Sequence, residues 1–97
     1  MRDDYEKTVR LLKAFADEGR LQILEYAQKG ISNPGEISDE LNRHRSTVEK
    51  HLRVLLKAAI VEKVPSLTEG GQLSVRYRIR ENANEFLTAM TDAVKKL

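Results

Sequence analysis

The fold of this 97-residue chain is decided by the stretch STVEKHLRVLLK at residues 46–57. Placed on a helix, four apolar residues gather on one side, at the spacing of a stripe that packs into a core: Val48, Leu52, Leu55 and Ala59. The opposite side carries one hydroxyl and three cations: Ser46, Lys50, Arg53 and Lys57. The pattern predicts a helix with one buried face and one cationic face turned to solvent.

The residues before this helix predict a partner helix. Asn33 is a good N-cap, Pro34 fits the first helical position, and Glu36 stands three residues after the cap. We therefore expect a short helix over about 34–42, with residues 43–46 as the break. Two helices joined by so few residues form a helix-turn-helix.

The residues after it predict a hairpin. Residues 60–64 are short and β-branched, which favours a strand, and residues 65–72, with two adjacent glycines, read as a turn. Residues 73–80 alternate apolar and polar, as in a half-buried antiparallel strand with an arginine-rich outer face. The hairpin would form a wing beside the cationic helix.

Three further helices are predicted by apolar periodicity, over about 4–16, 20–29 and 83–97. The element order is then α-α-α-α-β-β-α. We expect a mainly α fold with a small β-hairpin, a winged helix-turn-helix, forming a single domain over residues 1–97.

The first and last helices carry wider apolar stripes than so small a core can cover. We expect these stripes to form a homodimer interface, through Tyr5, Val9, Leu12, Phe86, Met90 and Val94. The alternative is that both helices only cap the core of a monomer.

Positive charge is concentrated in one part of the chain. Residues 41–80 hold nine Lys/Arg and three Asp/Glu, whereas residues 1–40 hold six and nine, and residues 81–97 two and three. A basic face on an otherwise acidic domain is typical of a nucleic-acid binder. An ordinary solvated helix and strand remain the alternative.

Several classes of function are disfavoured. The chain has no cysteine, and His44 and His51 lack an evident third ligand, so we expect no metal site. No nucleophile–base pair or glycine-rich phosphate loop is present, so we expect neither an enzyme nor a cofactor. A charged start and no long apolar run predict a cytoplasmic protein with no membrane partner.

Three segments carry a family resemblance. Residues 11–24, LLKAFADEGRLQIL, resemble the LKALADPTRLRIL opening of the ArsR-type winged helix-turn-helix repressors. Residues 46–55 resemble the STVSHHLKVL recognition helix of that family, and KAAIV at 57–61 is similar to the EAGLV that leads into its wing. The resemblance implies a prokaryotic, homodimeric regulator of transcription, a repressor, that binds specific sequences in double-stranded DNA.

The resemblance and the helical geometry of residues 46–57 together predict which residues contact DNA. By position, the groove-facing residues of the family match Arg45, Ser46, Thr47, Glu49 and Lys50, and its wing matches Arg76 and Arg78. We add neighbouring groups for phosphate contact: Arg43, His44 and Arg53.

The chain also departs from the family. Metal-sensing members place Cys-x-Cys in the third helix or histidine ligands in the last helix, and this chain has neither, so its effector is unknown. Two other functions stay open: a winged-helix module for protein–protein interaction, and a non-specific DNA- or RNA-binding protein of chromatin type.

Overall fold

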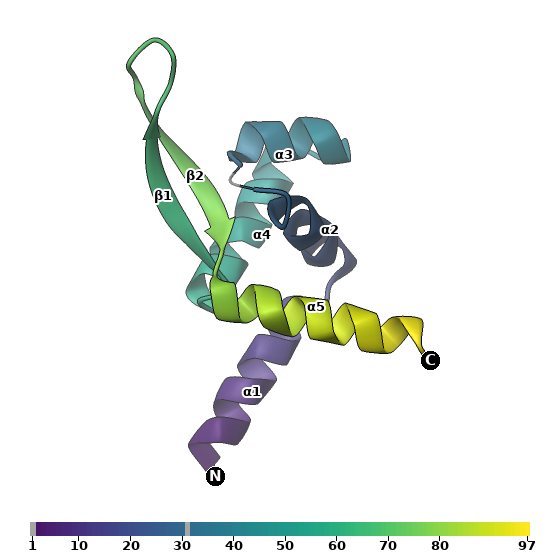
Figure 1. The fold of residues 1–97 in the computed structure, drawn as a ribbon. Helices are drawn as coiled ribbons and strands as arrows, with labels where there is room; N and C mark the ends of the chain where they lie inside the picture. Colours follow the sequence, from purple (N-terminus) through teal and green to yellow (C-terminus); the bar gives the residue numbers. More distant parts are fainter. Residues whose placement is uncertain (1, 31) are drawn as a thin grey trace.

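Over residues 2–30 and 32–97, the computed structural model forms five helices and one antiparallel hairpin (Figure 1). The elements follow in the order α1 (Arg2–Phe15), α2 (Glu18–Ala27), α3 (Pro34–Leu41), α4 (Arg45–Lys57), β1 (Val61–Leu67), β2 (Leu73–Ile79) and α5 (Glu81–Lys95). This confirms the predicted winged helix-turn-helix and its element order.

Local hydrogen bonds set where the central helices begin. The Asp17 carboxylate accepts from the backbone N–H of Arg20 at 3.0 Å and caps α2. At α3, Asn33 Oδ1 accepts from the Glu36 N–H at 2.8 Å, and Asn33 Nδ2 donates back to Glu36 Oε1 at 3.3 Å. The predicted N-cap is thus confirmed, and the two side chains also bond each other.

Left-handed residues end both helices of the helix-turn-helix. Asn42, at φ 52°, closes α3, and asparagine tolerates this conformation well. Ala59, at φ 60°, follows α4, and the backbone N–H of Ile60 reaches back to the Leu55 carbonyl at 2.9 Å. Ala59 occupies the place of the glycine in the family's EAGLV pattern, so it holds a conformation that glycine adopts more readily.

The core lies where α4 crosses α2 and α3. The predicted inner face of α4 is confirmed for Val48, Leu52 and Leu55, which are at most 1% exposed. It is wrong for Ala59, because the helix ends at Lys57 and the left-handed Ala59 is exposed. Val48, Leu52 and Leu55 belong to one cluster with buried residues of the other elements, among them Ile23, Leu24, Ile37, Ile60 and Leu87. The opposite face of α4 is thereby fixed toward solvent.

The hairpin departs from the prediction in two ways. Strand β1 is longer than expected, because Pro65 pairs with Val75 instead of starting the turn. Proline is tolerated here because each strand of a two-stranded sheet has an open edge, where a missing N–H is harmless. Second, the apolar face is not inward throughout, since Leu67 and Leu73 are 70% and 77% exposed.

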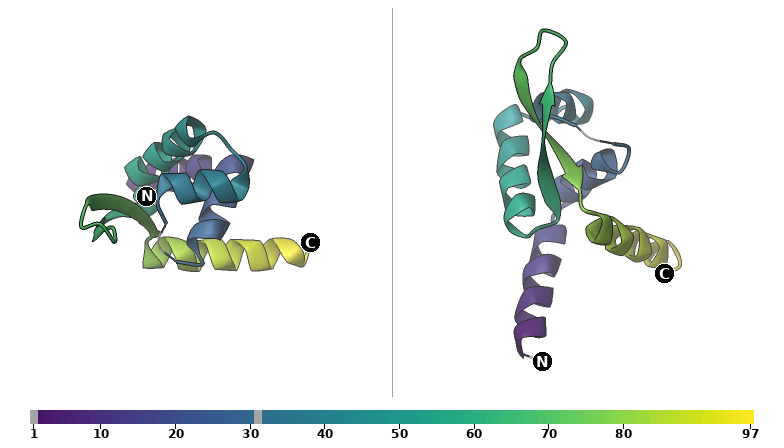
Figure 2. Two further views of the ribbon diagram at one scale, coloured as in Figure 1. Left: turned by 90° about the horizontal axis from the view of Figure 1, so that it is seen from above. Right: turned by 60° about the vertical axis from the view of Figure 1, so that its left-hand side comes forward.

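The reason is the length of the wing. Its base rests on the core through Val61, Tyr77 and Ile79, while its outer half projects past the helices, with no body to cover it (Figures 1 and 2). Alternation in sequence defines two faces of a strand, but it does not say how far the covering layer extends.

The terminal helices extend from the central body (Figure 2). Among residues 4–15 of α1, only Ala14 and Phe15 in the last turn are buried, and the Phe15 ring packs on Phe86 of α5 at 5.2 Å between centroids. The radius of gyration is 14.3 Å, against about 12.5 Å for a compact chain of this length. No helix in the described part of the chain is long and apolar enough to cross a membrane.

Candidate nucleic-acid interface

The outer face of α4 is cationic and open. Lys50, Arg53 and Lys57 are exposed, as the helical pattern predicts. Among residues 2–30 and 32–97, none of the three has a carboxylate within 4.0 Å. Their positive charge is therefore available to an external anion such as a DNA phosphate.

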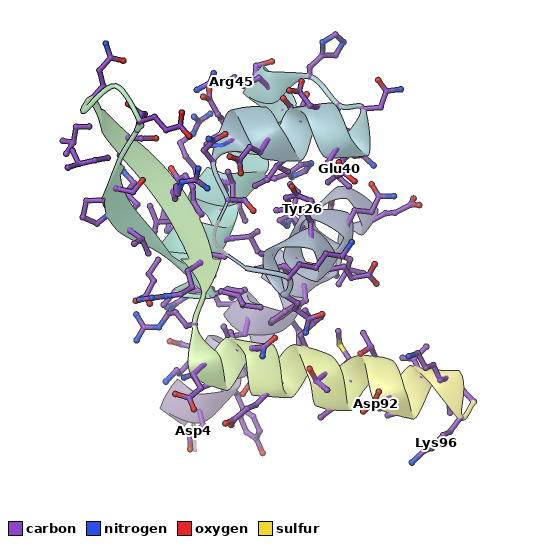
Figure 3. The ribbon with its side chains drawn as sticks, turned by 45° about the horizontal axis from the view of Figure 1, so that its top comes forward. Asp4, Tyr26, Glu40, Arg45, Asp92 and Lys96 are labelled. Carbon is purple, nitrogen blue, oxygen red and sulfur yellow. The ribbon has the colours of Figure 1, made fainter. Side chains whose placement is uncertain are left out.

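The start of α4 presents hydrogen-bonding groups ahead of these cations. Ser46 is exposed and Thr47 half-buried, and His44 is an exposed N-cap residue that makes no side-chain cap bond. Arg45 is exposed and its Nε donates to Glu49 Oε1 at 3.2 Å, one turn along the helix. Arg45 lies at the same end of the molecule as the hairpin tip, far from Lys96 (Figure 3).

Arg43 holds the turn in place. Its side chain is half-buried, and Nε and Nη2 both donate to Gln22 Oε1, at 3.0 and 2.7 Å. This contact ties the break between α3 and α4 to α2, and so helps to fix the direction in which α4 leaves the turn. The sequence offered no signal for this pair, because Gln22 is an unremarkable polar position on α2.

Both predicted wing arginines are ion-paired. Arg76 donates to Glu36 of α3 from Nη2 to Oε1 at 3.0 Å and from Nη1 to Oε2 at 3.3 Å. Across the hairpin, Arg78 donates to Glu62 Oε1 from Nη2 at 2.8 Å and from Nε at 3.0 Å. The expectation that Arg76 lies on an open outer face is wrong, because it is half-buried against α3. The wing tip, residues 68–72, holds one acid and no cation.

An arginine that the sequence reading left out joins three helices. Arg20 Nε donates to the Ala14 carbonyl at 2.6 Å and Nη2 to the Lys13 carbonyl at 3.2 Å, both at the end of α1. Its Nη1 lies 3.3 Å from Nδ1 of His51 on α4, and 3.9 Å from Asp17. Arg20 therefore links the end of α1 to the middle of the cationic helix.

His51 is a half-buried packing residue of α4. Burial lowers its pKa below 6.5, the nearby cations Arg20, Arg43 and Lys50 lower it further, and Asp17 acts in the opposite direction. The packing is close, since a Cβ added at Gly19 would lie 2.8 Å from His51 Nε2. A neutral imidazole suits this site.

The pKa of Asp17 is lowered, chiefly by the backbone N–H of Arg20 that it accepts. The charges of Arg20 and His51 act in the same direction, and burial opposes them. The carboxylate is therefore held in its ionised form, in which it caps α2.

Most of the residues expected at a dimer interface are apolar side chains exposed in the single chain. The exposed fractions are Tyr5 63%, Val9 49%, Leu12 48%, Phe86 43% and Val94 59%. Met90 is half-buried against the core. The described residues contain no group of three or more His, Cys, Asp or Glu that could hold a metal ion.

Comparison with known proteins finds similarity to regulators of transcription. The profile of the bacterial regulatory protein arsR family matches residues 17–63, which contain α2, α3 and α4. The uncharacterized HTH-type transcriptional regulator MJ1325 of Methanocaldococcus jannaschii is 41% identical over 61 residues, which are 62% of this chain and 68% of that protein.

Solved structures agree over nearly the whole chain. HlyU from Vibrio cholerae is 28% identical, with a TM-score of 0.80 over 96% of this chain and 97% of that one. The homodimeric winged helix-turn-helix DNA-binding domain of Mb0332 from Mycobacterium bovis, a possible ArsR-family transcriptional regulator, has a TM-score of 0.84 at 23% identity, over 98% of this chain and 84% of that one.

Proposed function

The chain belongs to the arsR family of bacterial regulatory proteins, and from this premise we propose that it is a cytoplasmic repressor that binds specific double-stranded DNA as a homodimer. Membership makes it a DNA-binding regulator of transcription and not an enzyme. The observation that carries the proposal is the outer face of α4, whose cations stand opposite the fully buried Val48, Leu52 and Leu55.

The face divides into two kinds of contact. Ser46, Thr47 and Lys50, on the first turns of α4, reach base edges in the major groove, with Arg45 and Glu49 beside them. Arg53 meets backbone phosphates further along the helix, and Arg43 and His44 do so at the turn. The first group specifies sequence and the second mainly supplies affinity.

The wing arginines require an exchange of partners. A guanidinium fork binds a carboxylate or a phosphate with the same geometry. Arg76 and Arg78 therefore reach DNA by leaving Glu36 and Glu62, or stay paired and contribute little. Because of this competition, we propose that the wing is the weaker contact and α4 the stronger one.

The dimer forms through the exposed stripes of α1 and α5. Its twofold axis would place two α4 helices about 34 Å apart, one turn of duplex, over a pseudo-palindromic site. The proposal is supported by the exposed apolar residues, and by the M. bovis domain, which is itself homodimeric. Two coupled half-sites also increase both the affinity and the length of sequence read.

Selection of bound molecules from random duplex DNA tests this function. We expect enrichment of an inverted repeat with half-site centres about 10 base pairs apart, and affinity for it at least about 10³-fold above that for unrelated duplex. Equal affinity for all duplexes would instead indicate a non-specific, chromatin-type binder. Absence of salt-dependent DNA binding would favour a protein-interaction module.

Two further measurements test the proposed dimer and the proposed repressor role. Sedimentation at micromolar concentration should give a dimer, and a monomer would contradict the twofold arrangement. Transcription in vitro from a promoter that overlaps the selected site should fall when the protein is added. A rise would show an activator.

A further inference from the structure

A cavity of about 350 Å³ lies where α1, α2 and the end of α4 meet. It is lined by apolar and cationic residues alone: Arg10, Lys13, Ala14, Arg20, Val54, Lys57 and Ala58. This volume is within the range of small-molecule sites, about 300–1,000 Å³. The cavity is separate from the first turns of α4, where the base contacts are proposed.

The lining has two parts with different chemistry. Ala14, Val54 and Ala58 give an apolar floor, whereas all the other lining groups are positively charged. Arg10, Lys13 and Lys57 have no carboxylate within 4.0 Å among the described residues. A ligand with a negative head and an apolar body would satisfy both parts at once.

The floor of the cavity lies away from the apolar stripe of α1. On the helix, Ala14 lies almost opposite the stripe of Val9 and Leu12, whereas Lys13 borders it. A ligand on this floor would therefore meet the proposed partner protomer only at the edge that Lys13 forms.

One lining residue connects the cavity to the DNA-binding helix. Arg20 is held by the carbonyls that end α1 and by His51 on α4, so a negative group at Arg20 acts on both helices. We propose that this cavity binds a small organic anion, a carboxylate on a hydrocarbon or aryl body, and that occupancy changes the affinity for DNA through Arg20. The second half of the proposal rests on the proposed function, and the first does not.

Calorimetry on the DNA-free chain tests the binding itself. Octanoate is the probe, and octylamine and 1-octanol are controls of similar length with a positive or no charge. We expect saturable binding of octanoate at one site per chain, weaker binding of 1-octanol, and none of octylamine. Failure of octanoate, 4-phenylbutyrate and benzoate to bind at millimolar concentration would overturn the proposal.

Variants locate the site. Val54→Phe fills the apolar floor at a position 38% exposed, so the chain should fold normally and lose octanoate binding. The double variant Arg10→Ala, Lys13→Ala should weaken octanoate at least about tenfold. Lys96→Ala, an exposed cation on the far end of α5, is the matched control and should bind as the parent does. Unchanged binding in both test variants would place the ligand elsewhere and overturn the assignment.

The effect of octanoate binding on DNA affinity is measured last, with the selected duplex. Saturating octanoate should shift DNA affinity by several-fold, and the duplex should shift octanoate affinity by the same factor. No shift, with octanoate still bound, would overturn the coupling alone. If the double variant instead lowers DNA affinity and the salt slope while octanoate binding is unchanged, these cations belong to the DNA backbone contact and the ligand site is overturned.

Discussion

The outer face of α4 and the arginines of the wing have similar charge in sequence but different surroundings in the fold. Lys50 and Arg53 on α4 have no carboxylate within 4.0 Å in the described residues. Arg76 and Arg78 on the wing each bind one at 3.0 Å or less. A count of cations therefore does not give the charge that a surface offers to DNA.

The cause is the position of each element against its neighbours. Helix α4 turns one face into the core and the other away from the rest of the chain, so few groups can pair with it. The hairpin lies beside α3 on one side and pairs Arg78 with Glu62 directly across the strands. DNA binding through Arg76 or Arg78 must therefore compete with an existing ion pair, as must binding through Arg45 of α4, whereas binding through Lys50 or Arg53 does not.

The largest expected effect concerns the buried support of α4. Leu55→Ala should lower the free energy of unfolding by about 2–5 kcal/mol, since it opens a cavity at a fully buried site. Val54→Ala, on the exposed side, should change it by less than about 0.5 kcal/mol. Urea unfolding measures both, and equal losses would mean that the two faces of α4 are wrongly assigned.

The next effect compares the two regions directly on DNA. Lys50→Ala should lower discrimination between the selected and unrelated duplex by about 1–3 kcal/mol, as expected for a residue that reads a base edge. Arg78→Ala should change discrimination by much less, because this side chain is already paired with Glu62. The reverse order in fluorescence anisotropy titrations would show that the wing is the main reader of sequence.

A third change should weaken one of the two ion pairs of the wing. Glu36→Gln removes the charge that pairs with Arg76 and keeps the N-cap of α3, because that cap uses the backbone N–H of residue 36. DNA affinity should rise at low salt, and the slope of log affinity against log salt should steepen by about one ion. Glu40→Gln, an exposed change of the same charge on α3, is the control. Equal slopes in the two variants would show that net charge, not release of Arg76, is responsible.

Ala59 lies between α4 and β1 in a left-handed backbone conformation that is strained for alanine. Ala59→Gly should raise the free energy of unfolding by about 0.5 kcal/mol, because relief of the left-handed conformation outweighs the entropy that glycine adds to the unfolded chain. Ala58→Gly, one residue earlier at φ −81°, should lower it by about 0.5–1 kcal/mol. Thermal or urea unfolding distinguishes them, and a loss in both would exclude strain at Ala59.

The smallest expected effect is a pH dependence of α4 packing. The lowered pKa of His51 means that the unfolded chain binds a proton more readily than the native chain. Stability should therefore decrease as the pH falls from 6.5 toward the folded pKa of His51. His51→Gln should flatten this part of the curve. A curve that His51→Gln leaves unchanged would contradict the assignment.

Local patterns were enough to predict most of the fold. Three features depend only on neighbours within a few residues, so they can be read from the sequence: the N-cap at Asn33, the stripe of Val48, Leu52 and Leu55, and the alternation of β2. The Arg76–Glu36 pair joins positions 40 residues apart. Only the three-dimensional path of the wing brings them together, which is why the sequence predicted an open arginine instead.

The sequence also predicted the α4 part of the candidate site, but not the contacts made by Arg20. The residues of α4 follow from helical geometry once the buried stripe is known, and the structure exposes Lys50 and Arg53 as expected. Arg20 was missed because its role depends on backbone carbonyls of α1 and a histidine ring of α4, and neither leaves a mark in the local pattern.

The most direct test is to titrate isotope-labelled protein with the selected duplex and follow the backbone amide signals by NMR. The largest shifts should fall in residues 44–53, with smaller shifts along the wing and none on the outer side of α5. Shifts concentrated on α5, with residues 44–53 unchanged, would contradict the assignment of α4 as the helix that reads DNA.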